Sequence, residues 1–390
     1  MKAFWIILSI LVGIGSILVF RDNLPAALQP YISALANNIL QTDAPLNSTA
    51  VNNPGAQQQA KAQTQAILGS TAPQVITDMS AAVSRTIRKV FLAVEQAEGA
   101  GARVRRSIGT PSLRNLSPFL MLDHFTIKPG SGFPDHPHRG QETITYLLEG
   151  AVDHEDFAGN AGTIEAGDLQ FMTAGRGILH AEMPHQNADG SANVGLQLWV
   201  DLPRQLKNCE PRYRDLRAAE IPSVDADDGR VHIKVISGQS HGVDSVKDLA
   251  YTPVWILDIT VKPGGRVVQP VPAGWTAFAY TLDGDVRFAN GSAKDSGDEN
   301  PSTLVHAFHN IVFAPDGDAV TASVDAAATK SARFVLVAGT PLDQPVVQYG
   351  PFVVTNKDEV YQALMDYQSF SNGFERAKGW KSEIGKTMVE

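Results

Sequence analysis

The chain has 390 residues, of which 43% are hydrophobic and 19% are charged, a composition typical of a globular protein with room for two domains. Its formal net charge is −9 and it contains no long basic run, which argues against direct binding of nucleic acid through the phosphates. The single cysteine, Cys209, excludes an internal disulfide and thiolate metal clusters. Any bound metal must therefore be held by nitrogen and oxygen atoms.

The N-terminal stretch MKAFWIILSILVGIGSILVF contains an uncharged run from Ala3 to Phe20, between Lys2 and Arg21. A run of this length is about long enough to span a bilayer, so we expect residues 1–22 to form a hydrophobic helix that anchors the protein in a membrane. A cleaved signal segment is the alternative, and it would place the protein in the periplasm, in a lumen or outside the cell. If the segment is absent from the mature protein, the cytoplasm or nucleus is expected instead.

Residues 23–84 are rich in Ala, Gln, Asn and Thr and contain few large apolar side chains. This composition is typical of a low-complexity tether rather than of a folded domain. We therefore expect the globular part to begin near Arg85.

Downstream, short apolar runs such as ETITYLLEG, GLQLWVDL and VWILDITV alternate with turns containing Gly, Pro and Asp. Many short strands separated by turn signals predict an all-β fold built from antiparallel sheets. Near the C-terminus, Val360, Leu364 and Tyr367 have helical spacing, which predicts an amphipathic helix that closes a barrel.

The β-rich part contains an internal repeat. The stretches KPGSGFPDHPHRGQETITYLLEGAV from Lys128 and KPGGRVVQPVPAGWTAFAYTLDGDV from Lys262 align without a gap at an offset of 134 residues. We therefore expect two tandem β-domains, at residues 85–230 and 231–390. In this alignment Pro270 and Pro272 replace two histidines of the first copy, so only the first copy can bind metal there.

Those two histidines, His136 and His138, stand one residue apart, and on a strand their side chains point to the same face. His180 and Glu182 repeat this spacing after a turn bounded by glycines. Three imidazoles and one carboxylate suit a divalent transition metal and leave two positions open on a six-coordinate ion. The alternative is that the first pair lies on a surface loop, with His180 in the core and Glu182 exposed.

The stretches ARVRRSIG, LRNLSPFLMLDHF, FPDHPHRGQETITYLLEG, GDLQFMTAGRGILHAEMP, GPFVVTN and NGFERAKGWKSEIG resemble the pirin family over about residues 85–385. This resemblance implies a bicupin, two antiparallel jelly-roll barrels in tandem. It further implies iron bound only in the first barrel, by His136, His138, His180 and Glu182. Two residues depart from the family pattern: Gln141 replaces a usually aromatic residue, and His124 stands where an acidic one is common. Both are expected near the pocket, where they would affect substrate preference.

Some pirins resemble quercetin 2,3-dioxygenases, which open the flavonol ring with O2 and release carbon monoxide. The resemblance thus implies an oxidoreductase that uses Fe(2+), or another divalent transition metal, with a flavonol-like substrate and Glu182 as the base. The rival functions are an iron-dependent redox-sensing transcriptional cofactor without turnover, and a metal-storing scaffold. We expect no direct contact with nucleic acid and a monomeric globular part.

Overall fold

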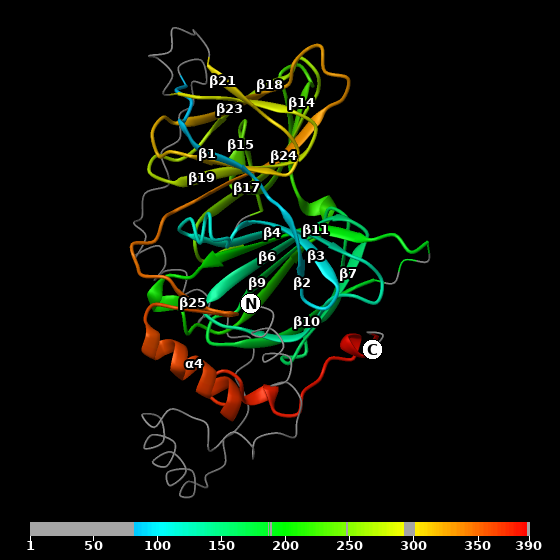
Figure 1. The fold of residues 1–390 in the computed structure, drawn as a ribbon, viewed down its shortest axis with the longest axis vertical. Helices are drawn as coiled ribbons and strands as arrows, with labels where there is room; N and C mark the ends of the chain where they lie inside the picture. The colour runs from blue at the N-terminus through cyan, green and yellow to red at the C-terminus, as the bar shows by residue number, and fades with distance from the viewer. Residues whose placement is uncertain (1–81, 186, 188, 247–248, 292–300, 388–390) are drawn as a thin grey trace, which may run out of the picture. The chain divides into compact units, whose positions relative to one another are not determined.

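The computed structural model describes residues 82–387, except 186, 188, 247–248 and 292–300. Two β-barrels follow each other along the chain, and the strands paired within their sheets are antiparallel. Figure 1 shows the first barrel in cyan and green and most of the second in yellow and orange. The predicted all-β class with two antiparallel barrels is confirmed.

Each barrel consists of a seven-stranded and a four-stranded sheet. The large sheet of the first barrel has the order β12 (Arg212–Leu216), β9 (Leu169–Thr173), β6 (Gln141–Glu149), β11 (Asn193–Asp201), β4 (Phe119–Ile127), β3 (Ala102–Ile108) and β2 (Glu95–Glu98). Its small sheet has the order β5 (Phe133–His138), β10 (Ile178–Pro184), β7 (Ala151–Asp156) and β8 (Ala161–Glu165).

The second barrel repeats this plan. Its large sheet has the order β1 (Ile87–Leu92), β22 (His309–Phe313), β19 (Thr276–Asp283), β24 (Ala332–Gly339), β17 (Val254–Val261), β14 (Val231–Ser237) and β13 (Ser223–Ala226). Its small sheet has the order β18 (Arg266–Pro270), β23 (Ala319–Ser323), β20 (Val286–Ala289) and β21 (Ser302–Val305). Two short hairpins complete the strands of the described residues: β15 (Gln239–Ser240) with β16 (Val243–Asp244), and β25 (Val347–Tyr349) with β26 (Phe352–Val354).

The period of two in the strands decides what each face of a large sheet contacts. On β6, Ile144 and Tyr146 belong to an apolar cluster that also contains Phe278 and Tyr280 of β19, so the two large sheets pack against each other. The residues between them, such as Thr145, point to the opposite face, into the first barrel. One face of each large sheet thus joins the barrels, and the other lines a barrel interior.

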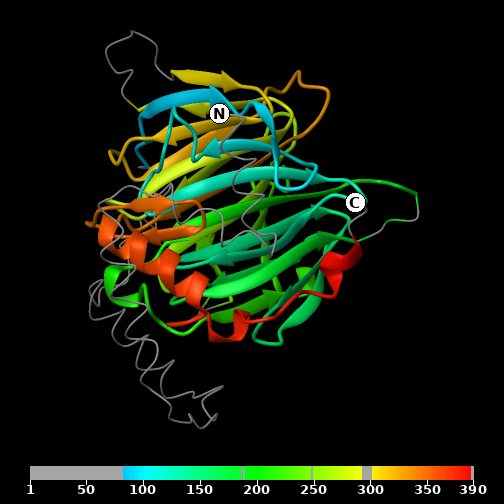
Figure 2. The same cartoon turned by 60° about the horizontal axis from the view of Figure 1, so that its bottom comes forward.

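The two chain ends are exchanged between the barrels. Strand β1 comes first in the described chain but pairs with β22 of the second barrel, as its blue ribbon in Figure 1 shows. At the other end, helix α4 (Lys357–Ser369) and the 3-10 turns η6 (Glu375–Ala377) and η7 (Ile384–Thr387) follow the second barrel in sequence. Phe352 of β26, Ala363 of α4 and Phe374 pack against Leu179 of β10. Residues 351–387, called the C-terminal segment below, therefore cover the first barrel (Figure 2). Among the described residues, the 3-10 turn η3 (Arg204–Leu206) lies between β11 and β12 of the first barrel, and η4 (Ala218–Glu220) lies between the two barrels in sequence.

Helix α4 begins where Asn356 caps it, since the Asn356 side chain accepts a hydrogen bond from the Glu359 amide at 2.9 Å. It ends at Phe370, whose φ of 56° is in the left-handed region. At 13 residues it is about 20 Å long, well short of the roughly 30 Å of a bilayer core.

Two predictions concern the membrane, the N-terminal transmembrane helix and the membrane localisation, and both are corrected. Among the residues that the structure describes, no helix combines the length and apolar character needed to cross a membrane. The segment for which the anchor was predicted, residues 3–20, lies outside the described residues, as does nearly all of the expected tether. The transmembrane N-terminal helix and the membrane localisation derived from it therefore have no support in the structure, and we do not retain them.

Candidate metal centre

The antiparallel pair β5 and β10 places three imidazoles together. His136 lies directly opposite His180, and His138 follows two residues later on the same face of β5. The ring centroids of His136 and His180 are 4.4 Å apart, and that of His138 lies 5.0 Å from His180. The potential ligand atoms of the three histidines all lie within 4.8 Å of one another. The structure thus assembles the three histidines predicted from two distant stretches of sequence.

The nitrogen atoms of these rings have the positions expected of ligands. His136 Nδ1 donates to the Pro134 carbonyl oxygen at 2.8 Å, which leaves Nε2 as a lone-pair donor. This Nε2 lies 3.0 Å from His180 Nε2. Two nitrogens bound to one ion at about 2.1 Å and a right angle would be about 3.0 Å apart. The pair therefore fits cis ligands of a single cation.

Burial supports the same interpretation. His138 and His180 are each 1% exposed, and His138 Nε2 has no hydrogen-bond partner among the described residues. Burial, followed by the neighbouring His136, holds the pKa of both rings well below the usual value of histidine. Neutral imidazoles with unused nitrogens are the form in which histidine binds a metal. The residues present thus fit a divalent metal ion.

Glu182 follows His180 by two residues on β10 and is 4% exposed. It is not part of the three-histidine cluster. Its carboxylate accepts hydrogen bonds from Thr145 Oγ1 at 3.2 Å and from Gln197 Nε2 at 2.9 Å. These contacts fix the orientation of the Glu182 side chain, and its role as the fourth ligand stays a prediction.

Sequence reasoning missed the residues that support the site. Gln197 of β11 holds Glu182, and its own Oε1 accepts from Trp199 Nε1 at 3.3 Å. The Trp199 ring meets His138 edge-on, with centroids 5.0 Å apart. The signal was present in GLQLWVDL, where Gln197 and Trp199 alternate with leucines that face the other barrel. Polar residues that alternate with buried leucines along a strand indicate that the opposite face of the strand lines a polar barrel interior.

The wall behind Glu182 is also polar. His154 of β7 lies opposite Glu182 in the ladder, and its ring is nearly parallel to that of Tyr213, with centroids 6.1 Å apart. His154 Nε2 lies 3.5 Å from a carboxylate oxygen of Asp215. The interior of the first barrel therefore contains titratable and hydrogen-bonding groups well beyond the cluster itself.

The two residues that depart from the family pattern, Gln141 and His124, lie in different parts of the structure. Gln141 contacts the cluster, because its side-chain amide lies 2.9 Å from His138 Nδ1. His124 points instead to the interface between the barrels, where its Nδ1 lies 3.2 Å from the Tyr280 hydroxyl. Of these two residues, only Gln141 lies at the candidate metal centre.

Two family models match the chain: Pirin over residues 101–200, and the Pirin C-terminal cupin domain over residues 256–373. Human pirin is 48% identical over 302 residues, covering 76% of this chain and 98% of its own length. A pirin-like protein of Solanum lycopersicum is 47% identical over 299 residues, covering 77% of this chain and 97% of its own. This chain belongs to the pirin family.

Solved structures agree with this assignment. A quercetin 2,3-dioxygenase from Acinetobacter baumannii aligns with a TM-score of 0.65 and 28% identity, over 74% of this pirin and 98% of its own chain. GK1651 from Geobacillus kaustophilus aligns with a TM-score of 0.58 and 32% identity, over 68% of this pirin and all of its own chain. The tandem cupin architecture implied by the resemblance to the pirin family is thereby confirmed.

Proposed function

We propose that this pirin binds one Fe(2+) ion through His136, His138, His180 and Glu182 and opens a flavonol such as quercetin with O2. The observation that carries the proposal is the convergence of three imidazoles in the first barrel, two of them buried. The structural likeness to a protein named quercetin 2,3-dioxygenase adds weight to the choice of substrate. Histidine nitrogens and a carboxylate suit Fe(2+), and they also accept other divalent transition metals.

The bound metal would supply a Lewis acid with open positions for substrate and O2. The protein itself would supply the base. Glu182 Oε2 accepts one hydrogen bond, from Gln197, and retains a lone pair for the 3-hydroxyl proton of a flavonol. Because Thr145 and Gln197 fix the carboxylate, it need not reorganise when it accepts this proton.

The burial of the three histidines indicates the direction of approach. His138 and His180 are buried, whereas His136 is only half-buried. Substrate would therefore enter on the side of His136, with the edge of Trp199 closing the site behind His138. In the proposed reaction, one flavonol and one O2 give a ring-opened ester and one molecule of carbon monoxide, so no external reductant is needed.

The test uses the full chain loaded with Fe(2+) without oxygen and then mixed with quercetin in air. We expect loss of the flavonol absorbance and consumption of one O2 per quercetin, with stoichiometric iron in the protein. Glu182→Gln should lower turnover more than iron content, because an amide is a poor ligand and no base. Bound iron without oxygen consumption would refute the dioxygenase and favour the redox-sensing function, whereas absence of iron binding would refute the metal site as well.

A further inference from the structure

Gln141 is a fully buried amide beside a proposed metal ligand. It is the first residue of β6, three residues after His138, and is 0% exposed. One end of its amide lies 2.9 Å from His138 Nδ1, and the other lies 2.8 Å from the Arg139 carbonyl oxygen and 3.2 Å from that of Pro351. This side chain thus touches a ligand, the adjacent turn and the C-terminal segment at once.

The chemistry of these neighbours determines how the amide is oriented. Carbonyl oxygens only accept hydrogen bonds, so the Gln141 NH2 group must face Arg139 and Pro351. The amide oxygen then faces His138 and can only accept, which requires a proton on His138 Nδ1. In a neutral imidazole this leaves Nε2 without a proton. His138 Nε2 is the buried nitrogen that lacks a hydrogen-bond partner among the described residues, so it is free to bind a cation.

We propose that Gln141 is a positioning residue that fixes the Nδ1–H tautomer of His138 and couples this ligand to the C-terminal segment through Pro351. The inference rests on the proposed metal binding and adds to it a link between the metal centre and a distant part of the chain. A ligand imidazole that donates its other N–H to an oxygen is oriented and made a stronger donor. Here that oxygen belongs to a side chain whose position the C-terminal segment itself determines.

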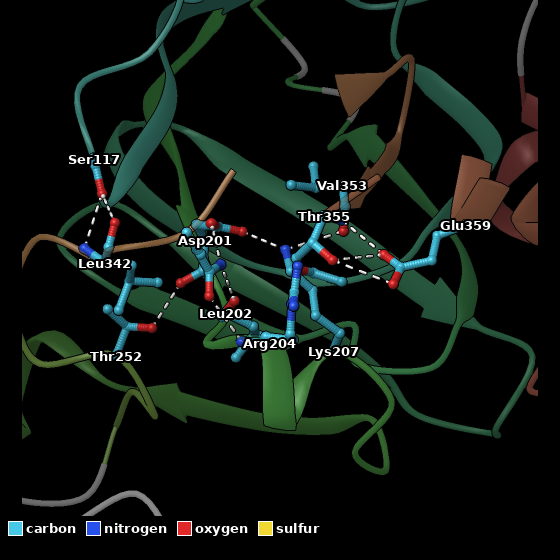
Figure 3. Close-up of polar contacts among 12 residues, drawn as sticks. Ser117, Asp201, Leu202, Arg204, Lys207, Thr252, Leu342, Val353, Thr355 and Glu359 are labelled. Atoms are coloured by element: carbon cyan, nitrogen blue, oxygen red, sulfur yellow. Dashed lines mark hydrogen bonds and ion pairs between the residues drawn. The ribbon is translucent and has the colours of Figure 1, made fainter. Parts of the chain in front are cut away.

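The C-terminal segment is firmly held at this turn. The Arg139 amide donates to the Pro351 oxygen at 3.2 Å, and the Val353 amide donates to the Arg139 oxygen at 2.9 Å. Lys207 Nζ, shown in Figure 3, donates to the carbonyl oxygens of Val353 and Gly140 at 3.1 and 2.8 Å. At Gly140, where φ is 81°, an added Cβ would lie 2.0 Å from the Val353 oxygen, so the approach requires glycine.

A buried ion pair continues the attachment further along the segment. Arg139 Nη1 donates to Asp366 of α4 at 2.7 Å, and its Nη2 donates to the Asn372 oxygen at 2.6 Å. Arg139 directly follows the ligand His138, so the helix is attached one residue away from the metal centre. Because coupling between two sites is reciprocal, metal binding should strengthen the docking of residues 351–355 as much as docking strengthens metal binding.

The second barrel lacks this arrangement. At the offset of the repeat, Gln141 corresponds to Trp275 and His138 corresponds to Pro272. Trp275 packs in the apolar interior of the second barrel, with its ring centroid 5.7 Å from that of Trp255. The glutamine and the histidine that it contacts are thus both present in the first copy of the repeat and both replaced in the second, as expected if Gln141 positions His138.

The first measurement needs no metal. Nitrogen NMR of the metal-free full chain, labelled at histidine and assigned by comparison with His138→Ala, reports the tautomer of His138. We expect the Nδ1–H form in the native protein and a mixture of tautomers in Gln141→Leu. An Nε2–H form in the native protein would overturn the inference whether or not the protein binds iron.

The second measurement is Fe(2+) affinity, determined anaerobically by competition with a chelator. Gln141→Leu should bind Fe(2+) about 10- to 100-fold more weakly. The matched control is Gln269→Leu, since Gln269 is a 1% exposed amide of the second barrel that donates to Pro270 O at 2.9 Å and accepts from Ser240 at 2.6 Å. The control should lose stability but keep its Fe(2+) affinity within about twofold of the native value.

Hydrogen exchange then tests the coupling. Addition of Fe(2+) should slow amide exchange at Val353 in the native chain and have a smaller effect in Gln141→Leu. If the native chain binds Fe(2+) and both leucine variants bind it equally well, Gln141 has no positioning role while the proposed function stands. If the native chain binds no Fe(2+), the proposed function fails, and the tautomer measurement alone decides the role of Gln141.

Discussion

The interiors of the two barrels differ at matched positions of one repeated module. Where the first barrel has His136, His138 and Thr145, the second has Pro270, Pro272 and Ala279. Opposite Pro270 in the ladder stands Ala319, as His180 stands opposite His136 in the first barrel. The remaining space in the second barrel is filled by an apolar cluster that includes Trp255, Trp275, Phe288 and Phe334. The same backbone plan thus encloses a polar site in one copy and an ordinary hydrophobic core in the other.

The comparison shows that the three-histidine cluster is an addition to the fold and not a condition for it. Burial of polar groups without partners costs free energy, and the first barrel contains several such atoms, including His138 Nε2, His180 Nδ1 and Gln170 Nε2. The second barrel also buries such atoms, at Arg85 and Asn310, but its sheets close without the histidines. We interpret the polar interior as a feature retained for ligand binding at the expense of stability.

The largest expected effect is the loss of metal in His138→Ala. Removal of a ligand should weaken Fe(2+) binding by more than the roughly 10- to 100-fold typical of changes to supporting residues. The far-UV circular dichroism should be unchanged, because the second barrel forms the same sheets without ligands. Pro272→Ala is the matched control and should leave iron content unaltered. Full iron occupancy in His138→Ala, or unfolding like that of a structural zinc site, would contradict the comparison.

A change in the apolar interior of the second barrel should lower the stability of the protein and leave its Fe(2+) affinity unchanged. Phe334 is 0% exposed and packs against Phe288 with centroids 5.2 Å apart. Phe334→Ala should reduce the free energy of unfolding by about 3–5 kcal/mol through lost burial and a cavity. Urea denaturation measures this loss, and Fe(2+) affinity of the folded variant should stay native. A large loss of affinity would show that the barrels are not independent in this respect.

A reciprocal exchange sharpens the comparison at one matched position. Ala279→Thr places a hydroxyl in the apolar interior and should destabilise the protein by about 1–3 kcal/mol. Thr145→Ala removes one donor to Glu182 and should cost only about 1 kcal/mol, while it lowers quercetin turnover. Quercetin turnover and urea unfolding are measured for both variants. If Ala279→Thr and Thr145→Ala lowered turnover equally, the interiors of the two barrels would not have separate roles.

The smallest expected effect concerns the interface between the two barrels, where corresponding residues of the repeat again have different partners. Tyr146 donates to Asp258 at 2.7 Å, whereas the corresponding Tyr280 pairs with His124. Burial, and then Arg105 and Arg333, lowers the pKa of His124 to about 4.

Because this folded-state pKa lies below the unfolded value of about 6.5, the unfolded chain takes up the proton first as the pH falls. The contribution to stability is therefore complete above about pH 6.5 and is lost as the pH falls toward about 4. His124→Gln should show a shallower decline in unfolding free energy across this window. Identical slopes in urea titrations of the two proteins would refute the assignment.

Much of the first barrel's site could be predicted from sequence, because its key signals are local. The period-two spacing within His136–His138 shows which side chains share a face, and the gapless repeat shows which copy lost them. The contacts of Gln197 with Glu182 and of Gln141 with Pro351 were not predictable in this way. They join strands whose register is set by the whole sheet, and no local pattern encodes that register. The apolar N-terminal run shows the opposite failure, since a strong local signal led to a membrane helix for which the described structure gives no support.

The exchanged chain ends have a consequence for how the protein is made. Ser84 hydrogen-bonds Thr321 across 237 residues, and Arg139 pairs with Asp366 across 227. During synthesis the first member of each pair leaves the ribosome long before its partner exists, and such distant contacts form slowly. Neither barrel can be completed from its own half of the chain. The second barrel needs strand β1, which precedes the first barrel in sequence, and the first barrel needs helix α4, which follows the second barrel. A nascent chain that ends before Asp366 would therefore carry all three histidines on a first barrel that lacks its attachment to helix α4.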